Sequence, residues 1–151
     1  MAEALTEQDW DIRLFIYQVF ADRGSPPSVS EAAGWSGTSI EDASRAFHRL
    51  HRGHALFLEP GTDDVRMANP LSAIPTSYRV EVGDRTLYAN CAWDSVGIPA
   101  MLHLDASINV RFDGEEPIGY SIRDGALDAD PRLVVHFPVR FSHWYDDLIH
   151  T

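Results

Sequence analysis

Apolar side chains recur with helical spacing near the start of the chain, and polar residues mark both ends of this helix. The stretch Thr6-Glu7-Gln8-Asp9 supplies a capping hydroxyl and early acids, which suit the positive end of a helix dipole. Gly24 follows the last apolar position, so we expect the helix to end there. The positions between them follow the i, i+3, i+4 pattern of one buried face, namely Ile12, Phe15, Ile16, Val19 and Phe20.

Two shorter helices are expected next. A second capping box, Ser28-Val29-Ser30-Glu31, opens a short helix that stops within residues 34–37. Thr38 or Ser39 caps a third helix, and Gly53 terminates it. The third helix has an apolar inner face made of Ile40, Ala43, Phe47 and Leu50.

A hairpin completes the N-terminal half. The short apolar runs 55–58 and 65–68 flank a Pro-Gly turn, a pattern typical of two antiparallel strands. Three helices followed by a hairpin are the order of a winged helix-turn-helix. Residues 69–75 contain two prolines, which favour an extended linker. We therefore expect a winged-helix-like three-helix domain over residues 1–70.

Alternating apolar and polar residues dominate the second half. Residues 78–82 and 85–88 alternate around a Gly-Asp turn, which predicts a hairpin with one buried face. Residues 91–103 look helical, but Gly97 and Pro99 interrupt them, so we expect two short turns or a kink.

Further strands are expected toward the C-terminus. Residues 107–112 and 118–122 flank an Asp-Gly turn, and the continuous apolar run 133–137 is typical of a central strand. Residues 141–149 have the spacing of an amphipathic helix. The predicted fold class is α+β, in which residues 71–151 form a small mixed α/β domain with a mainly antiparallel sheet.

Composition and charge narrow the expected partners. The chain has 151 residues, 44% of them apolar, which is enough for a packed core. The net charge is −11, and such a field repels phosphate backbones and anionic membranes. The start of the chain has no signal-peptide pattern and there is one cysteine, which fits a reducing compartment. We therefore expect a cytoplasmic protein that binds neither nucleic acid nor membrane.

The candidate chemistry lies in the segment Tyr88-Ala89-Asn90-Cys91-Ala92-Trp93-Asp94, where a strand ends and a helix begins. Helix N–H groups favour a thiolate at such a position. Cys91 and Asp94 are three residues apart and face the same way on a helix. A nucleophilic thiolate beside a proton-holding carboxyl suits attack followed by protonation. The alternative is a small buried cysteine beside an ordinary capping acid.

This segment, together with residues 78–82 and the following Ser95-Val96-Gly97-Ile98-Pro99-Ala100, resembles the core of the alkylmercury lyases. The resemblance implies a winged-helix-like domain joined to an α/β catalytic domain, with no cofactor. It implies catalytic roles for Cys91 and Asp94 on an organomercurial or other small organic substrate, with mercury held by Cys91. In that family a second cysteine from a later strand also binds mercury, and the aspartate protonates the carbon.

This chain departs from that family pattern because the later strand, expected at residues 132–137, has no cysteine. A single thiolate forms a stable two-coordinate mercury adduct, so we expect carbon–mercury cleavage to be impaired unless a small thiol supplies the second ligand. His136 is a candidate substitute ligand, and Arg132 is a candidate for binding an anion. With Tyr88 and Trp93 they form the expected substrate pocket.

Three functions therefore stay open. The first is an alkylmercury-lyase-like enzyme, impaired or recruited to another lyase or isomerase reaction. The second is a non-catalytic binder of mercury or another soft metal through Cys91. The third is a winged-helix regulator that senses a ligand, because Arg45, Arg49 and Arg52 lie on the third helix.

Overall fold

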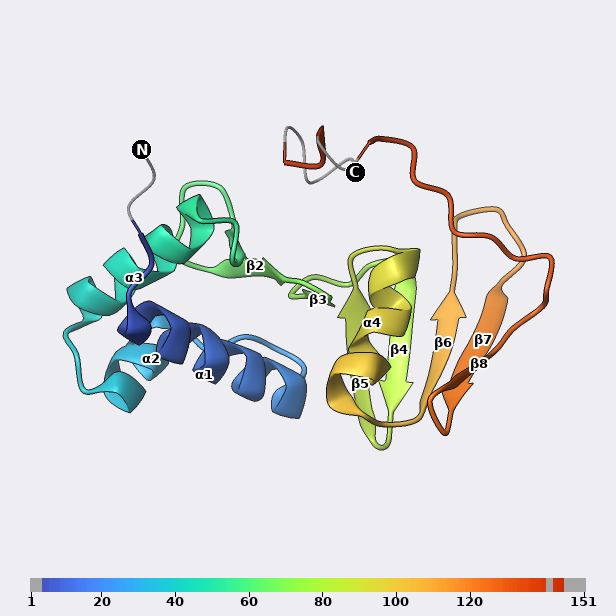
Figure 1. Cartoon of the computed structure of the whole chain (residues 1–151), viewed down its shortest axis with the longest axis horizontal. Helices are drawn as coiled ribbons and strands as arrows, with labels where there is room; N and C mark the ends of the chain where they lie inside the picture. The colour runs from blue at the N-terminus through green and yellow to red at the C-terminus, as the bar shows by residue number, and fades with distance from the viewer. Residues whose placement is uncertain (1–3, 141–142, 146–151) are drawn as a thin grey trace.

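The computed structural model describes residues 4–140 and 143–145. Figure 1 shows the helices of the N-terminal half at one end of the molecule and a further helix packed on the sheet at the other. The described residues form helices α1 (Glu7–Arg23), α2 (Val29–Ser36), α3 (Ile40–Arg52) and α4 (Ala92–Leu102). The strands are β1 (Phe57–Leu58), β2 (Val65–Ala68), β3 (Leu71–Ser72), β4 (Tyr78–Val82), β5 (Arg85–Ala89), β6 (Ala106–Val110), β7 (Ile118–Arg123) and β8 (Ala126–Asp128).

The N-terminal helices begin and end at the predicted residues. The Thr6 hydroxyl accepts a hydrogen bond from the Asp9 N–H, and the Asp9 carboxylate accepts one from the Thr6 N–H. Gly24 ends α1 with φ of 78°, a left-handed conformation that costs glycine little. The predicted stripe points into the core, where Ile12, Ile16 and Phe20 are almost fully buried. Buried apolar area of this kind is the main source of helix stability in a protein.

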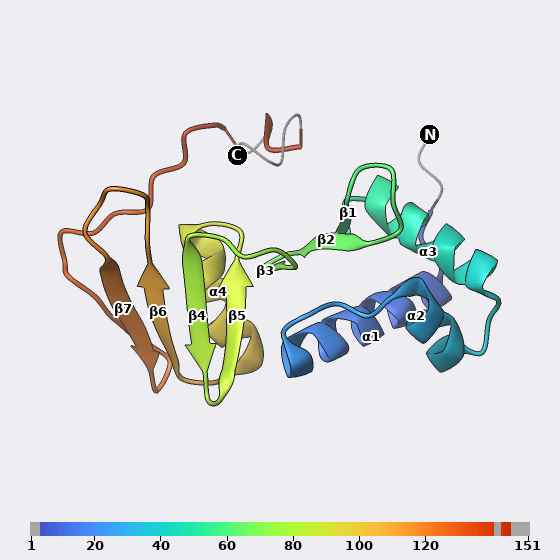
Figure 2. The same cartoon turned by 180° about the vertical axis from the view of Figure 1, so that it is seen from behind.

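A single antiparallel sheet runs through both halves of the chain. Its strand order is β1-β2-β3-β5-β4-β6-β7-β8, and Figure 2 shows the sheet from behind. The expected linker contains β3, because Leu71 pairs with both Ala68 and Ala89 and is fully buried. The expectation of an extended linker at 69–75 is therefore wrong in part. Leu71 pairs with strands β2 and β5, and this pairing keeps its apolar side chain buried in the core. A domain boundary at residue 70 remains a prediction.

Helix α4 covers one face of the C-terminal part of the sheet. Val80 pairs with Leu87 on one side and with Ile108 on the other, and all three are buried on this face. A single helix continues through Pro99, so the expectation of two short turns is wrong. Ile98 and Pro99 are buried, and this packing outweighs the cost of proline in a helix interior.

The expected central strand at residues 133–137 is absent, and the sheet instead ends with β8. The described segment 133–137 has no strand pairing, and Val134 is 85% exposed. Pro131 and Pro138 flank it, and a turn bond from the Leu133 N–H to the Asp130 carbonyl directs the chain away from the sheet edge. The expected helix at 141–149 lies largely outside the described residues. Among the described residues, no helix combines the length and apolar character that a bilayer span requires.

Candidate active site

Cys91 and Asp94 lie together in the first turn of α4. Strand β5 ends at Ala89, and Cys91 is the N-cap of the helix, with an extended backbone conformation. Its sulfur accepts a hydrogen bond from the Asp94 N–H at 3.5 Å. The thiol and the carboxyl therefore occupy one helix turn, as their spacing predicted.

Asn90, the residue before the cysteine, connects the Asp94 carboxyl to the rest of the protein. Its side-chain amide donates to Asp94 Oδ2 at 3.1 Å and to Asn69 Oδ1 at 3.1 Å. Tyr17, on α1, donates its hydroxyl to the Asn69 carbonyl at 2.8 Å. The N-terminal helix thus supports the turn that Asn90 contacts, and Asn90 fixes the carboxyl. Sequence reasoning did not find Asn90, although it lies within the quoted segment.

Burial raises the pKa of Asp94 above the ordinary range of aspartate, although hydrogen bonds from Asn90 and Cys91 oppose this shift. Removing a carboxylate from water disfavours its charged form. Asp94 therefore keeps its proton to a higher pH than a surface aspartate does. This is the property that a general acid requires.

The pKa of Cys91 is also raised, which corrects the expectation of a helix-activated thiolate. Burial is the largest cause, and the negative charge of Asp94 adds to it. Backbone N–H groups of Trp93 and Asp94 favour the thiolate, but they do not outweigh the loss of hydration. At neutral pH this thiol is protonated.

We therefore expect iodoacetamide to alkylate Cys91 with an apparent pKa above that of a free thiol. In Asp94→Asn this pKa should fall, because the nearby negative charge is removed while the burial is retained. The measurement is the alkylation rate as a function of pH, followed by intact mass. Wild-type protein with a thiol pKa at or below the unperturbed value of about 8.5 would contradict the prediction.

A cavity of about 430 Å³ adjoins this helix turn. It lies on the face of the sheet that α4 covers. Its walls are mainly apolar and come from α4, from β4, β6, β7 and β8, and from the segment after β8. The lining side chains include Ala92, Val96, Val110, Phe112, Ile118, Leu127 and Leu133, together with the two tyrosines Tyr78 and Tyr120.

Both tyrosines stand close to Cys91. Burial raises the pKa of Tyr78 and of Tyr120, and the charge of Cys91 adds to both shifts. The Tyr120 hydroxyl lies 2.6 Å from the Ser95 hydroxyl. Ser95 donates to the Ala92 carbonyl at 2.6 Å, so the tyrosine is the donor in the pair. Both phenols are neutral at physiological pH, and sequence reasoning identified neither.

The other four residues predicted to form the substrate pocket do not all lie at the cavity. His136 lines the cavity. The side chain of Arg132 is 88% exposed and pairs with Asp130. Trp93 is 59% exposed and makes an edge contact with Phe137, with ring centroids 6.4 Å apart. Tyr88 pairs with Arg79 and projects to the other face of the sheet, since strand side chains alternate. The structure therefore brings only His136 of these four to the cavity.

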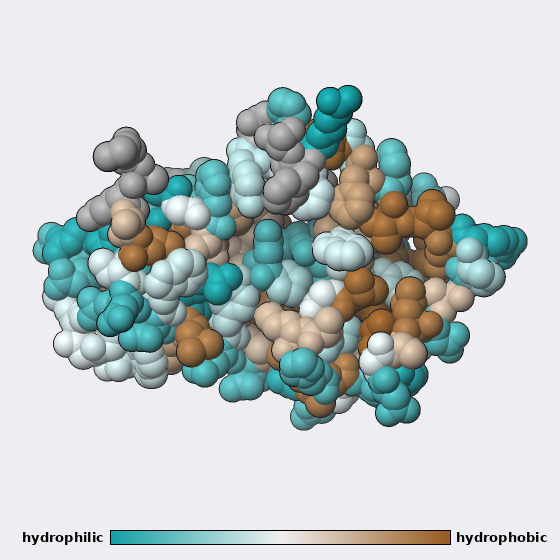
Figure 3. Space-filling model, in the orientation of Figure 1, coloured by the Kyte–Doolittle hydropathy of each residue, from teal (hydrophilic) through white to brown (hydrophobic). Residues whose placement is uncertain are grey.

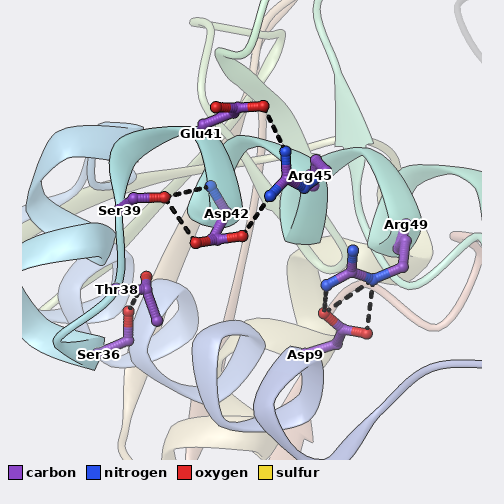
Figure 4. Close-up of polar contacts among 8 residues, drawn as sticks. All are labelled: Asp9, Ser36, Thr38, Ser39, Glu41, Asp42, Arg45 and Arg49. Carbon is purple, nitrogen blue, oxygen red and sulfur yellow. Dashed lines mark hydrogen bonds and ion pairs between the residues drawn. The ribbon is translucent and has the colours of Figure 1, made fainter.

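Polar side chains on α3 are held by internal partners (Figure 4). Arg45 pairs with Glu41 and Asp42, and Arg49 forms two-pronged contacts with Asp9. These carboxylates offset the charge that would bind DNA phosphates. No group of three metal-ligating side chains occurs among the described residues.

Comparisons with known proteins point to one family. A family model described as alkylmercury lyase (MerB) matches residues 71–148. The crystal structure of the mercury-bound form of MerB2 is similar to this fold with a TM-score of 0.67 and 26% sequence identity. The match covers 82% of this chain and 59% of the MerB2 chain, so the matched region falls well short of that protein's full length. A search of curated proteins found no match.

Proposed function

The chain belongs to the alkylmercury lyase family, and from this premise we propose that Cys91 binds organomercury cations one-to-one, with slow carbon–mercury cleavage. The observation that carries the proposal is one half-buried thiol in the same helix turn as Asp94, whose pKa is raised by burial, in a chain without a second cysteine. MerB2, a protein of similar structure, was crystallised in a mercury-bound form, which supports mercury as the ligand.

Binding begins as a thiol exchange. The organomercurial arrives as the complex R–Hg–SR′ of a small thiol. The Cys91 sulfur forms a bond to mercury, the bond from mercury to the carrier sulfur breaks, and the Cys91 proton leaves with the carrier as R′SH. Mercury is a soft metal and prefers sulfur ligands, so the adduct is stable even though burial raises the pKa of this thiol.

Cleavage requires a further ligand. The Asp94 proton adds to the carbon, the electron pair of the carbon–mercury bond forms the C–H bond, and RH leaves. Mercury then remains as a cation on one sulfur, beside a newly charged Asp94 carboxylate. A second thiolate would stabilise this state, and this sequence supplies none. The adduct is therefore expected to persist.

The test is intact-mass analysis after mixing the protein with methylmercury chloride. We expect one methylmercury group per chain in the wild type and none in Cys91→Ser. The matched control is Asp94→Ala, which should keep the adduct because the sulfur is intact. A full adduct in Cys91→Ser would overturn the proposal by placing mercury on another group.

A further inference from the structure

The two faces of the C-terminal part of the sheet differ in character. Figure 3 shows the α4 side of the molecule, where apolar surface gathers over the strands beyond the helix. Figure 2 shows the opposite side, where β4, β5 and β6 lie in front of α4 and no helix among the described elements covers them. Val80 and Ile108 are buried on the α4 side. Strand alternation therefore turns Arg79, Glu81 and Asn109 to the open face.

A second cavity, of about 270 Å³, lies on this open face and is lined by Thr76, Ser77, Arg79, Asn109 and Arg111. Arg79 lies directly opposite Asn109 across the β4–β6 pair. The Arg111 N–H donates to the Ser77 carbonyl at 3.0 Å, so these two residues lie opposite each other two positions further along. The four residues thus form the corners of a square, with the arginines on a diagonal. Diagonal neighbours across an antiparallel pair are about 7–8 Å apart, a separation that two arginine side chains can bridge through one ligand.

Three of these side chains have polar groups that the protein itself does not use. Within residues 4–140 and 143–145, the side chains of Ser77, Asn109 and Arg111 form no hydrogen bond or ion pair. Ser77 and Asn109 are half-buried at the cavity, where a bound group would satisfy them. The cavity therefore offers a hydroxyl, an amide and a guanidinium group to one ligand.

Arg79 is engaged on one side only. Its Nη2 contacts the Glu81 carboxylate at 3.0 Å and donates to the Thr86 hydroxyl at 3.4 Å. Both members of the ion pair have side chains more than 40% exposed, and exposed pairs of this kind are weak. Among the described residues the Nη1 and Nε groups have no partner, so a second fork of N–H donors is open to a ligand.

The charges at this cavity favour a small phosphoryl compound. Two guanidinium groups supply two positive charges, and a phosphate monoester carries about −1.5 to −2 near neutral pH. Its tetrahedral oxygens accept hydrogen bonds from several sides, whereas a carboxylate presents two oxygens in one plane. The net charge of −11 disfavours a polyanion such as nucleic acid. A small anion in the cavity experiences mainly the adjacent arginines, since charges beyond about 10 Å are screened in roughly 0.1 M salt.

We propose that this second cavity binds the phosphoryl group of a small molecule. Arg79 and Arg111 bind its oxygens from opposite corners, while the Asn109 amide and the Ser77 hydroxyl donate from the other two. The site lies on the opposite side of the sheet from α4 and Cys91, so it does not depend on mercury chemistry.

The test is isothermal titration calorimetry of the full chain at fixed ionic strength. The probes are glycerol 3-phosphate and, separately, inorganic phosphate. Each should show one saturable site with a dissociation constant below about 1 mM, and a tighter constant for the ester would identify an organic phosphate as the ligand. Succinate should bind more weakly than either, because its two charges lie on separate carboxylates and neither reaches all four donors.

Charge-removing variants locate the site. Arg111→Gln should weaken binding of both phosphate probes about tenfold or more, because a charge-assisted interaction is lost. Arg79→Gln should do the same, and it serves if thermal melting shows that the first variant folds poorly. Glu81→Gln should act in the opposite direction and strengthen binding, since it removes the negative charge beside Arg79. The matched control is Arg45→Gln, which removes the same charge from an exposed arginine on α3 and should leave the affinity unchanged.

Three results would overturn the inference. The first is the absence of saturable binding for both phosphate probes in the wild type. The second is an affinity in the folded Arg111→Gln and Arg79→Gln variants equal to that of the Arg45→Gln control, which would place the anion elsewhere. The third is succinate binding as tightly as the phosphate probes, which would refute the phosphoryl assignment. A mercury adduct on Cys91 is measured separately, so each of these results leaves the proposed function standing.

Discussion

Mixed with phenylmercury and no added thiol, the protein should release little benzene beyond the level of a solution lacking protein. The physical reason is the state left after protonation of the carbon, in which mercury(II) holds one sulfur and must find another ligand. This chain has one cysteine, and the described lining of the cavity offers apolar side chains, neutral tyrosines, His136 and Asp130. The adduct should accumulate, and gas chromatography of the headspace would measure the hydrocarbon.

Excess small thiol should convert the stalled adduct into a slow catalyst. A thiolate from solution completes the coordination of mercury, and Asp94 supplies the proton. The rescue should disappear in Asp94→Ala and persist in Asp130→Ala, a matched loss of another carboxyl at the cavity. Since protonation of Asp94 is required, the rescued rate should fall as the pH rises through its elevated pKa.

Rapid multiple turnover without thiol would contradict this expectation. It would mean that another side chain of this chain completes the coordination of mercury. His136 is the first suspect, because it lines the cavity and imidazole is a ligand for soft and borderline metals. Loss of that turnover in His136→Ala would then identify it.

Local signals made most of the fold predictable. Capping residues and helical spacing located α1, and alternation located β4 and β5. The errors occurred where distant packing decides the structure. Pro99 is tolerated because the helix around it is buried against the sheet, and Leu71 forms a strand because Ala68 and Ala89 provide partners. Such partners lie outside the sequence window that shows the local pattern.

In the candidate site, too, local spacing identified some residues and contacts between distant parts of the chain decided the others. Cys91 and Asp94 were found because a single helix turn relates them. Asn90 acts through Asn69, 21 positions earlier in the chain, and Tyr120 reaches Ser95 from another strand. The expected place of Tyr88 in the pocket was wrong because strand alternation turns it to the opposite face. Its neighbours in sequence did not reveal which face α4 covers.

The largest stability effect is expected from Asp9→Ala. The Asp9 side chain is fully buried and bound by the guanidinium of Arg49, with one contact of 2.7 Å. Figure 4 shows this pair joining α1 to α3. Removing the carboxylate leaves the Arg49 charge, only 18% exposed, without this partner. Loss of one member of a buried ion pair costs about 3–5 kcal/mol, which corresponds to a melting temperature lower by roughly 6–20 °C.

The pH dependence of this effect has a defined sign. Burial alone would raise the pKa of Asp9, but hydrogen bonds from Arg49 and Thr6 outweigh it and lower the pKa. The pair therefore stabilises the protein above the pKa of an unfolded aspartate, about 3.9, and the stabilisation is lost as the pH falls through the lower folded value. Thermal melting by circular dichroism between pH 7 and pH 3 should show wild type and Asp9→Ala converging in acid. Asp11→Ala, which removes an exposed carboxylate from the same helix, should melt close to the wild type throughout, and an equally large loss in that control would refute the assignment to the buried pair.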